Sequence, residues 1–449
     1  MSTNDAMLRD WLKEHRITEV ELLVPDMAAI ARGKILPTKK FLAGLDNDTL
    51  RLPESVFGQM VTGADAETKA LRPQSPDMIL APDAETICMV PWYREPTAQV
   101  ICDCLRNDQP VQLAPRQVLK NVLKLYEAKG WQPVVAPELE FFLSQKNLDP
   151  DYPLLPPAGK SGRPQTGRQA YSIDAVNEFD PLFEDIYDFC ESQEIGIDSL
   201  IHEEGVAQVE INFNHGAPLQ LADHAFLFKR TVRHAALRHD IYATFMAKPY
   251  ELEPGSAMHI HQSILDASGR NIFATRGGKD TRLFMAYIAG LQKYLPAAMP
   301  LIAPYVNSYR RLVRYLSAPV NTHWGHENRT VGLRIPESEA KNRRVENRVP
   351  GADSNPYLAI AASLACGYLG MTQNLSPTKA MEGNAYDSMR YQLPRHLLDA
   401  IQKFRSSDDL REILGEAFVD LFSDVKASEH DAYQQVISPW ERQHLLLNV

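Results

Sequence analysis

Residues 133–141 form the stretch PVVAPELEF, in which an apolar run leads into two glutamates spaced by one residue. The apolar run predicts a buried β-strand, and side chains two apart on a strand point to the same face. Glu138 and Glu140 would therefore lie side by side. Two like charges at one site are costly unless something compensates them, or one pKa rises. A half-exposed edge strand and a metal-binding strand both explain the pattern.

A second acidic strand is predicted in HEEGVAQVEINF, residues 202–213. Apolar side chains at positions 209, 211 and 213 alternate with polar ones at 208, 210 and 212, as on a strand with two different faces. The glutamates of this stretch are Glu203, Glu204 and Glu210. A solvated strand face is the alternative to a functional acidic group.

Two histidines alternate with other residues in GSAMHIHQS, residues 255–263. His259, His261 and Ser263 would share one strand face. Such histidines can share a metal ion, or one can bind a metal and the other a phosphate. A hydrogen-bonded pair in the core is the alternative.

A cationic segment, NRTVGLRIPESEAKNRRVENRVPG, spans residues 328–351 of a chain whose net charge is −10. Arg344, Glu346 and Arg348 would lie on one strand face, where they either pair with one another at the surface or face a substrate. The other cations of the segment are Arg329, Arg334, Lys341 and Arg343. An anionic substrate such as a nucleotide phosphate requires a cluster of this kind.

Taken together, the carboxylates, histidines and arginines predict a metal-dependent enzyme that handles phosphate. Ligands dominated by oxygen suit Mg²⁺ or Mn²⁺ better than zinc. The GxxxxGK[ST] phosphate loop and the protein kinase signatures are missing from the sequence. Any use of a nucleotide would therefore depend on metals and arginines.

The composition is that of a globular protein with more than one domain: 449 residues, 44% hydrophobic and 23% charged. The acidic balance argues against nucleic acid or an anionic membrane as the main partner. The uncharged-looking stretch 349–371 opens with Pro, Gly, Asp and Asn, and its apolar part, from Tyr357 to 371, is short for a membrane span, so it predicts a buried helix behind an Asn-Pro start. No secretory signal is visible, and the five scattered cysteines predict reduced thiols in a cytoplasmic protein, with metal binding by the CDC of 102–104 as an alternative.

The chain divides into two regions of different character. Short strand-like runs broken by Pro and Gly fill residues 1 to about 110, and strands alternate with long helices beyond them. The predicted fold class is α+β, with domains at 1–110 and 111–449. Helices are expected at 114–130 and 223–247. The Pro/Gly/basic segment 152–169 is too long for a plain connector and predicts either a flap or a disordered insertion.

The ordered motifs PELEF, HEEGVAQVEI, GSAMHIHQS, NSYRRL, NRTVGLRIP and RRVENRVPGADSNPYLAIAA resemble those of the glutamine synthetase superfamily. The resemblance runs from about residue 110 to the C-terminus. It implies an N-terminal β-grasp domain and a C-terminal catalytic domain, in which helices flank a curved antiparallel sheet. It also implies a dodecamer of two hexameric rings with active sites between subunits.

The resemblance assigns roles to individual positions. The first metal site would comprise Glu140, Glu203 and Glu210, and the second Glu138, His259 and Glu346. The positions that contact the nucleotide would be His261, Ser263, Lys341 and Arg344. The positions that bind glutamate would be Gly255, Arg311 and Arg348, with Arg329 and Arg334 on the transferred phosphate. Two or three Mg²⁺ or Mn²⁺ ions would then offset the paired carboxylates of the opening stretch.

The implied reaction uses ATP to phosphorylate the γ-carboxylate of L-glutamate, and a nitrogen nucleophile then displaces the phosphate. Three departures from glutamine synthetase concern that nucleophile. Ser317 stands where those enzymes place a glutamate that attracts ammonium, Arg314 and Tyr315 replace a Pro-Gly pair, and LPESVFGQ at 52–59 replaces a DGSS-like segment. A fourth departure, Pro254 in place of a common asparagine, affects how the glutamate amino group is held.

The dismantled ammonium site predicts a different amine. The chain resembles the γ-glutamylpolyamine and γ-glutamylputrescine synthetases of bacterial polyamine catabolism, which implies putrescine, spermidine or spermine as the class of substrate. Glu54 is either an anchor for a distal ammonium or a solvated loop carboxylate, and Tyr386 is expected to be a surface tyrosine. The alternatives are an ordinary glutamine synthetase, a ligase for a monoamine and a non-catalytic paralogue.

Overall fold

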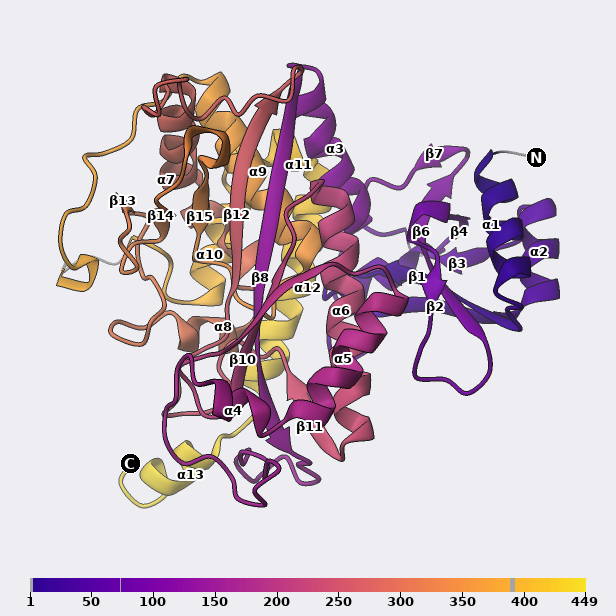
Figure 1. Ribbon diagram of the computed structural model, residues 1–449, viewed down its shortest axis with the longest axis horizontal. Coiled ribbons are helices and arrows are strands. Elements are labelled where there is room, and N and C mark those ends of the chain that lie inside the picture. Colours follow the sequence, from indigo (N-terminus) through magenta and orange to yellow (C-terminus); the bar gives the residue numbers. More distant parts are fainter. Residues whose placement is uncertain (1–2, 73, 388–391) are drawn as a thin grey trace.

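The computed structural model describes residues 3–72, 74–387 and 392–449, and it contains two β-sheets with flanking helices (Figure 1). The N-terminal sheet is ordered β2-β1-β6-β4-β3, with β5 and β7 also paired to β6. Its strands are β1 Glu19–Pro25, β2 Ala31–Pro37, β3 Arg51–Pro53, β4 Asp77–Pro82, β5 Cys88–Met89, β6 Thr97–Arg106 and β7 Gln109–Pro110. Helices α1 Thr3–Glu14 and α2 Thr38–Asp46 belong to this region.

The larger sheet is ordered β13-β14-β15-β12-β8-β10-β9, and β11 also pairs with β8. Its strands are β8 Trp131–Gln145, β9 Ile197–His202, β10 Gln208–Phe213, β11 Ile241–Thr244, β12 Met258–Asp266, β13 Trp324–His326, β14 Leu333–Ile335 and β15 Val345–Asn347. The expected antiparallel pairing holds except between β13 and β14, which run parallel. The predicted α+β class, with helices beside the sheets, is confirmed.

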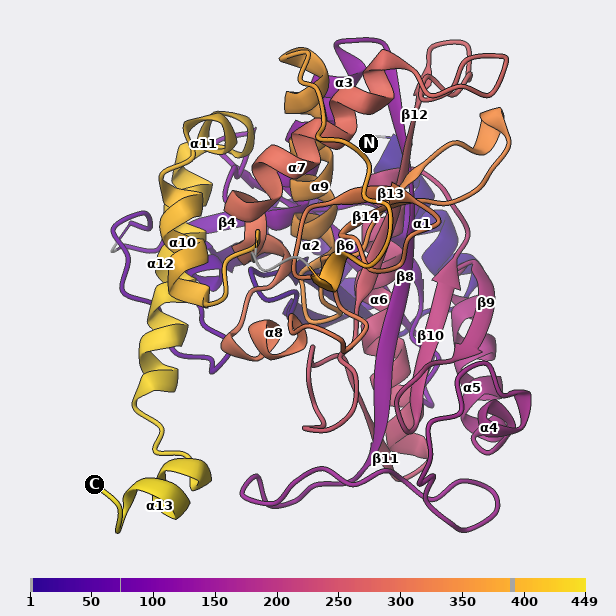
Figure 2. The same cartoon turned by 90° about the vertical axis from the view of Figure 1, so that its left-hand side faces the viewer.

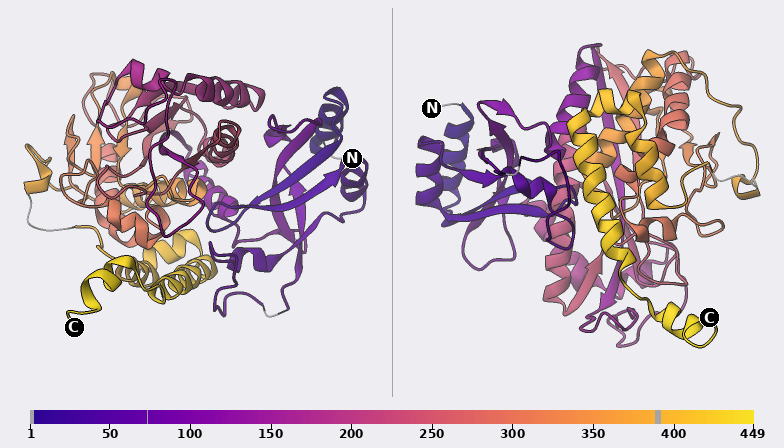
Figure 3. Two further views of the ribbon diagram at one scale, coloured as in Figure 1. Left: turned by 90° about the horizontal axis from the view of Figure 1, so that it is seen from below. Right: turned by 180° about the vertical axis from the view of Figure 1, so that it is seen from behind.

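Helices form layers behind the larger sheet (Figure 2). Those that pack on or near it are α3 Pro115–Glu127, α5 Asp180–Ser192, α6 Pro218–Arg238, α7 Arg282–Ile302 and α9 Pro356–Thr372. An outer group comprises α10 Leu397–Arg405, α11 Asp408–Leu414 and α12 Glu416–Gln434. The short helices are α4 Ile173–Asn177, α8 Val306–Arg311 and α13 Pro439–Leu445, the last of which lies beyond the end of α12, away from the body (Figure 3).

Alternation along the strands separates the core from the opposite face of the larger sheet. Leu139 and Phe141 of β8 are buried on the side of the helices, where Phe141 contacts Phe228 of α6. On β12, Gln262 donates a hydrogen bond to Ser363 of α9. Neighbouring side chains on a strand point to opposite faces. The glutamates of β8, at 138 and 140, and the histidines of β12, at 259 and 261, therefore point away from the helices.

The predicted buried helix is confirmed as α9, which is buried along nearly all of its length. The side chain of Asn355 accepts hydrogen bonds from the backbone of Tyr357 and Leu358 and so caps the first turn. Within the described part of the chain, no helix has both the length and the apolar character that a membrane span needs. The five cysteines are free and buried, as expected for core thiols.

The helix expected at 223–247 has different bounds. Helix α6 begins earlier, at Pro218, and ends at Arg238, after which the chain turns and forms β11. Asp240 adopts a positive φ of 60°, a left-handed conformation that cannot continue a helix. The apolar residues after this turn pair with β8 instead of extending the helix.

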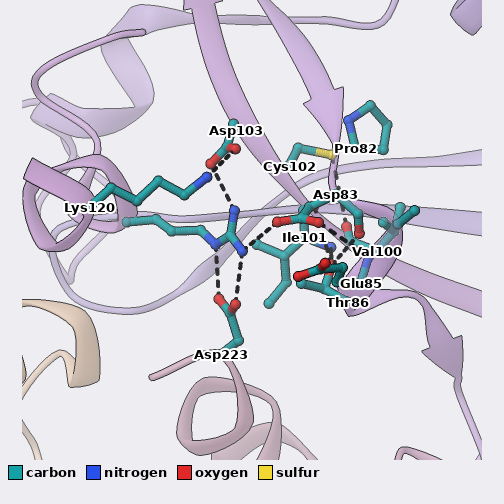
Figure 4. A network of polar contacts seen from close by, with 12 residues as sticks. Pro82, Asp83, Glu85, Thr86, Val100, Ile101, Cys102, Asp103, Lys120 and Asp223 are labelled. Carbon is teal, nitrogen blue, oxygen red and sulfur yellow. Dashed lines mark hydrogen bonds and ion pairs between the residues drawn. The ribbon is translucent and has the colours of Figure 1, made fainter. Parts of the chain in front are cut away.

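A buried guanidinium links the two sheets. Arg116, at the start of α3, donates hydrogen bonds to Asp223 of α6, to Asp103 of β6 and to Asp83 (Figure 4). Lys120 also pairs with Asp103. The network joins the N-terminal sheet to the helices that carry the larger sheet.

Candidate active site

Four strands of the larger sheet align their polar side chains in one row. The pairing places Glu210 of β10 opposite Glu140 of β8, and Glu138 of β8 opposite His259 of β12. His261 of β12 lies opposite Glu346 of β15. Cross-strand neighbours lie close enough for their side chains to interact, so the register itself assembles the site.

Glu138 and Glu346 are stabilised as carboxylates by cationic groups or hydrogen-bond donors. Glu138 contacts His259 at 3.2 Å and His261 at 2.7 Å, and despite its burial these hydrogen bonds hold its pKa well below the usual range. Glu346 lies between Arg334 at 2.8 Å and Arg348 at 2.5 Å. Burial opposes ionisation of Glu346, but the charge of Arg348 outweighs it and lowers the pKa to about 2.

Glu140, Glu203 and Glu210 have the opposite tendency. Burial and the charge of Glu203 raise the pKa of Glu140 to about 8, although the backbone N–H of Ala257 donates to it at 2.8 Å. Burial raises the pKa of Glu210 well above its usual range, and the charges of Glu138 and Glu140 add to this effect. Burial also raises the pKa of Glu203. Positive charge therefore compensates Glu140, Glu203 and Glu210 less than it compensates Glu346.

The donor atoms fit divalent cations. Two groups have ligand atoms that all lie within 4.8 Å of one another: Glu138, His259 and Glu346, and Glu140, Glu210 and His259. The first is the set expected for the second metal site. The second contains two of the three residues expected for the first metal site, and Glu203 lines the same cavity. Buried carboxylates with raised pKa values and mainly oxygen ligands suit Mg²⁺ or Mn²⁺.

Two cavities meet at Glu138 and Asn212, which line both. The first, of about 680 Å³, contains the positions expected to bind glutamate and phosphate, namely Gly255, Arg311, Arg329, Arg334 and Arg348. The second, of about 550 Å³, contains the positions expected to contact the nucleotide, namely His261, Ser263, Lys341 and Arg344. The structure thus brings together each predicted set and places the two sets in adjoining cavities.

Gly255 is required for a close approach. A Cβ atom at this position would lie 2.5 Å from Cγ of Arg311, closer than real side chains come. The guanidinium of Arg311 donates to the carbonyl oxygens of Val349 at 2.7 Å and Arg348 at 3.0 Å. The glycine therefore lets a buried cation be fixed by the backbone at the cavity wall.

The structure excludes several alternative interpretations of the sequence. Strand β8 lies between β12 and β10 and is not an edge strand. Glu210 is 6% exposed and Glu346 is 1% exposed, so neither belongs to a solvated face or a surface stripe. In the segment 152–169, Gln165 contacts His202 at 2.9 Å and Arg168 pairs with Glu204 at 3.1 Å, which attaches this loop to the cavity wall.

Two residues differ from their expected surroundings. Tyr386, expected at the surface, is buried, lines the first cavity and donates to the carbonyl of Ala318 at 3.1 Å. Glu54 is buried and paired with Arg106 at 2.6 Å, so it is not a solvated loop carboxylate. Among the described residues, Glu54 lines neither of the two cavities.

The position of Tyr386 in the cavity could not be predicted from sequence spacing, because its neighbours there are distant in the chain.

Comparison with known proteins agrees with this geometry. The family model of the glutamine synthetase catalytic domain matches residues 112–445. The chain belongs to the glutamine synthetase family. Gamma-glutamylputrescine synthetase PuuA of Escherichia coli (strain K12) is 35% identical over 435 residues, which cover 96% of this chain and 92% of the relative.

Other relatives of the glutamine synthetase family cover nearly the whole chain. Glutamate–isopropylamine ligase of a Pseudomonas species is 31% identical over 450 residues, 97% of this chain and 96% of the relative. The solved structure of a GmaS/ADP complex superposes with a TM-score of 0.83 at 27% identity and covers 99% of this chain and 100% of its own. Membership of the family makes the chain a ligase of the predicted class, which joins an amine to glutamate at the expense of ATP.

Proposed function

We propose that this ligase joins the γ-carboxylate of L-glutamate to a diamine or polyamine in cytoplasmic polyamine catabolism. One observation carries the choice of amine. The cavity retains the carboxylates, histidines and arginines that the family chemistry needs, but its wall presents Ser317 where glutamine synthetases are expected to place a glutamate for ammonium. A serine has no charge with which to attract ammonium at neutral pH.

The relatives support an amine other than ammonium. The Escherichia coli relative is named for putrescine and the Pseudomonas relative for isopropylamine. The GmaS structure is a complex with ADP, which supports nucleotide binding at the corresponding site of this chain. Putrescine, spermidine and spermine are the candidates that follow from the resemblance.

The proposed roles follow the two cavities. The glutamate-binding residues Arg311 and Arg348 hold the substrate in the first cavity. The nucleotide-binding residues Lys341 and Arg344 line the second cavity. The phosphates of the nucleotide would lie toward the junction with the first cavity, which Glu138 lines on both sides. Two or three Mg²⁺ or Mn²⁺ ions, held by the six metal-ligand positions, would supply positive charge to the phosphate oxygens.

Side chains of this protein then assist the transfer of the phosphoryl group. Arg329 and Arg334 offset charge on the transferred phosphoryl group, so that a γ-glutamyl phosphate forms. The site must exclude water from this anhydride, because water would otherwise hydrolyse it. The amine must reach the acyl carbon in its neutral form, and phosphate leaves as the amide bond forms.

The assembly follows from the same family resemblance. We propose a β-grasp domain at residues 1–110, a catalytic domain at 111–449 and a dodecamer of two hexameric rings with active sites between subunits. Sedimentation velocity on the full chain tests the assembly, and a monomer at enzyme-assay concentrations would contradict it.

The function is tested by phosphate release from ATP with Mg²⁺ and L-glutamate, over a panel of ammonium, monoamines, diamines and polyamines. Strong stimulation by a diamine or polyamine and weak stimulation by ammonium is the expected result. Equal stimulation by ammonium would identify an ordinary glutamine synthetase, and silence with every amine would identify a non-catalytic paralogue. Glu140→Gln provides the inactive reference, and Asp240→Asn, which removes an exposed ion pair with Lys146, provides a matched carboxylate control.

A further inference from the structure

One carboxylate in the first cavity has no role among the proposed metal ligands. Glu204 follows Glu203 in the chain and lines the cavity. Its side chain is 39% exposed, unlike the buried Glu140 and Glu210. Glu204 can therefore meet a substrate that enters from solvent.

Glu204 is held beside the position where the family's ammonium carboxylate is missing. The hydroxyl of Ser317 donates a hydrogen bond to one carboxylate oxygen of Glu204 at 2.5 Å. The other oxygen accepts from Arg168 at 3.1 Å. A short hydrogen bond to a charged acceptor orients that acceptor well, so Ser317 fixes a negative charge that it does not itself carry.

The surroundings of Glu204 leave negative charge in excess. Arg168 is shared, because its guanidinium also contacts Glu253 at 3.3 Å and donates to the carbonyl of Leu252 at 2.8 Å. Three carboxylates, those of Glu203, Glu204 and Glu253, thus lie near Arg168 and Lys248 at this edge of the cavity. A cationic group entering here gains Coulomb energy that a neutral group does not.

We propose that the carboxylate of Glu204 binds the cationic nitrogen of the amine substrate, with Ser317 as the residue that positions it. The inference rests on the proposed ligase function and names the residue that selects a protonated alkylamine or diamine. Arg168, from the loop 152–169, pairs with Glu204 when no amine is bound, and an entering ammonium group shares or replaces this partner. The negative charge for the amine comes from Glu204, in the turn between β9 and β10, instead of position 317.

Steady-state kinetics of Glu204→Gln test the proposal with two nucleophiles. Putrescine is cationic near neutral pH, whereas hydroxylamine is mostly neutral and does not need a carboxylate to bind. The variant is expected to raise KM for putrescine by about tenfold, as for the loss of one hydrogen bond to a charged group. Its kcat and KM with hydroxylamine, and its KM for ATP and glutamate, should remain those of the wild type.

Glu253→Gln is the matched control, since Glu253 shares Arg168 but does not line the cavity. It should leave KM for putrescine unchanged. Ser317→Ala should raise KM for putrescine by a smaller factor than Glu204→Gln, without loss of kcat, because the carboxylate remains but is less well oriented.

Each other outcome has a definite meaning. If Glu204→Gln leaves KM for putrescine unchanged, or lowers turnover of hydroxylamine as much as that of putrescine, the proposal is overturned and Glu204 has a structural role. A wild-type enzyme that turns over neither of these nucleophiles nor any other amine of the panel would overturn the ligase function itself. The hydroxylamine activity of the variant also reports that it is folded.

Discussion

Glu138 and Glu140 are two residues apart on β8, yet their pKa values move in opposite directions. Glu138 receives hydrogen bonds from His259 and His261, which outweigh its burial. Glu140 is buried and faces the charge of Glu203. The difference arises from partners on other strands, so a local pattern of Glu-x-Glu cannot reveal it.

The sequence predicted the residues of the cavity better than their contacts. The family resemblance assigned six positions to metal binding, and the structure places all six along one cavity. The hydrogen bond between Ser317 and Glu204 could not be predicted from the sequence, since 113 residues separate them. The burial of Tyr386 and the pairing of Glu54 with Arg106 likewise depend on tertiary contacts.

Ser317→Glu tests the choice of amine at this position. The larger carboxyl side chain fills part of the cavity and adds a charge next to Glu204. The ratio of kcat/KM for ammonium to kcat/KM for putrescine should rise about tenfold, equivalent to ~1.4 kcal/mol. Ser317→Ala should change the ratio only by the smaller factor by which it raises KM for putrescine, and a rise as large as that in Ser317→Glu would contradict an effect of the added carboxylate.

At the level of elements, strands were predictable where each carried its own alternation, as in β8, β10 and β12, but which strands pair was not. The end of α6 was not predictable from periodicity. The apolar residues of β11 continue a plausible helical pattern, and only pairing with β8 favours a strand. The contacts of Arg116 between the two sheets could not be predicted from the sequence either, because the aspartates that it contacts lie on separate elements.

The Arg116 network makes a quantitative prediction about that junction. Asp223 is buried and contacts Arg116 and the hydroxyl of Tyr357. Arg116→Met removes the guanidinium and leaves this carboxylate without a compensating charge, so the free energy of unfolding should fall by about 3–5 kcal/mol. Urea denaturation followed by circular dichroism measures the loss.

Lys120→Met is the matched variant for the network. Lys120 pairs only with the half-buried Asp103 among the ion pairs of the described chain, and Arg116 still contacts that aspartate. The free energy of unfolding should therefore fall by less than about 1 kcal/mol. Equal losses in the two variants would show that the buried guanidinium does not dominate the junction.

At the scale of the whole molecule, the net charge of −10 includes several carboxylates gathered in one cavity. Without metal, the folded state holds the proton of Glu140 more tightly than the unfolded chain does, because its pKa is raised to about 8. The stability that Glu140 contributes is therefore complete at low pH, below its unfolded pKa. It is lost as the pH rises through about 8.

Metal binding should reverse this loss, because a divalent cation binds the deprotonated carboxylates and stabilises only the folded state. The increase in Tm caused by Mn²⁺ should therefore be small near pH 6 and should grow toward about pH 8.5. Differential scanning calorimetry of chelator-treated protein, with and without Mn²⁺, measures it at each pH. In Glu140→Gln the increase in Tm caused by Mn²⁺ should depend less on pH, whereas in Asp240→Asn it should depend on pH as in the wild type. If the increase in the wild type does not depend on pH, protons and metal do not compete for these carboxylates.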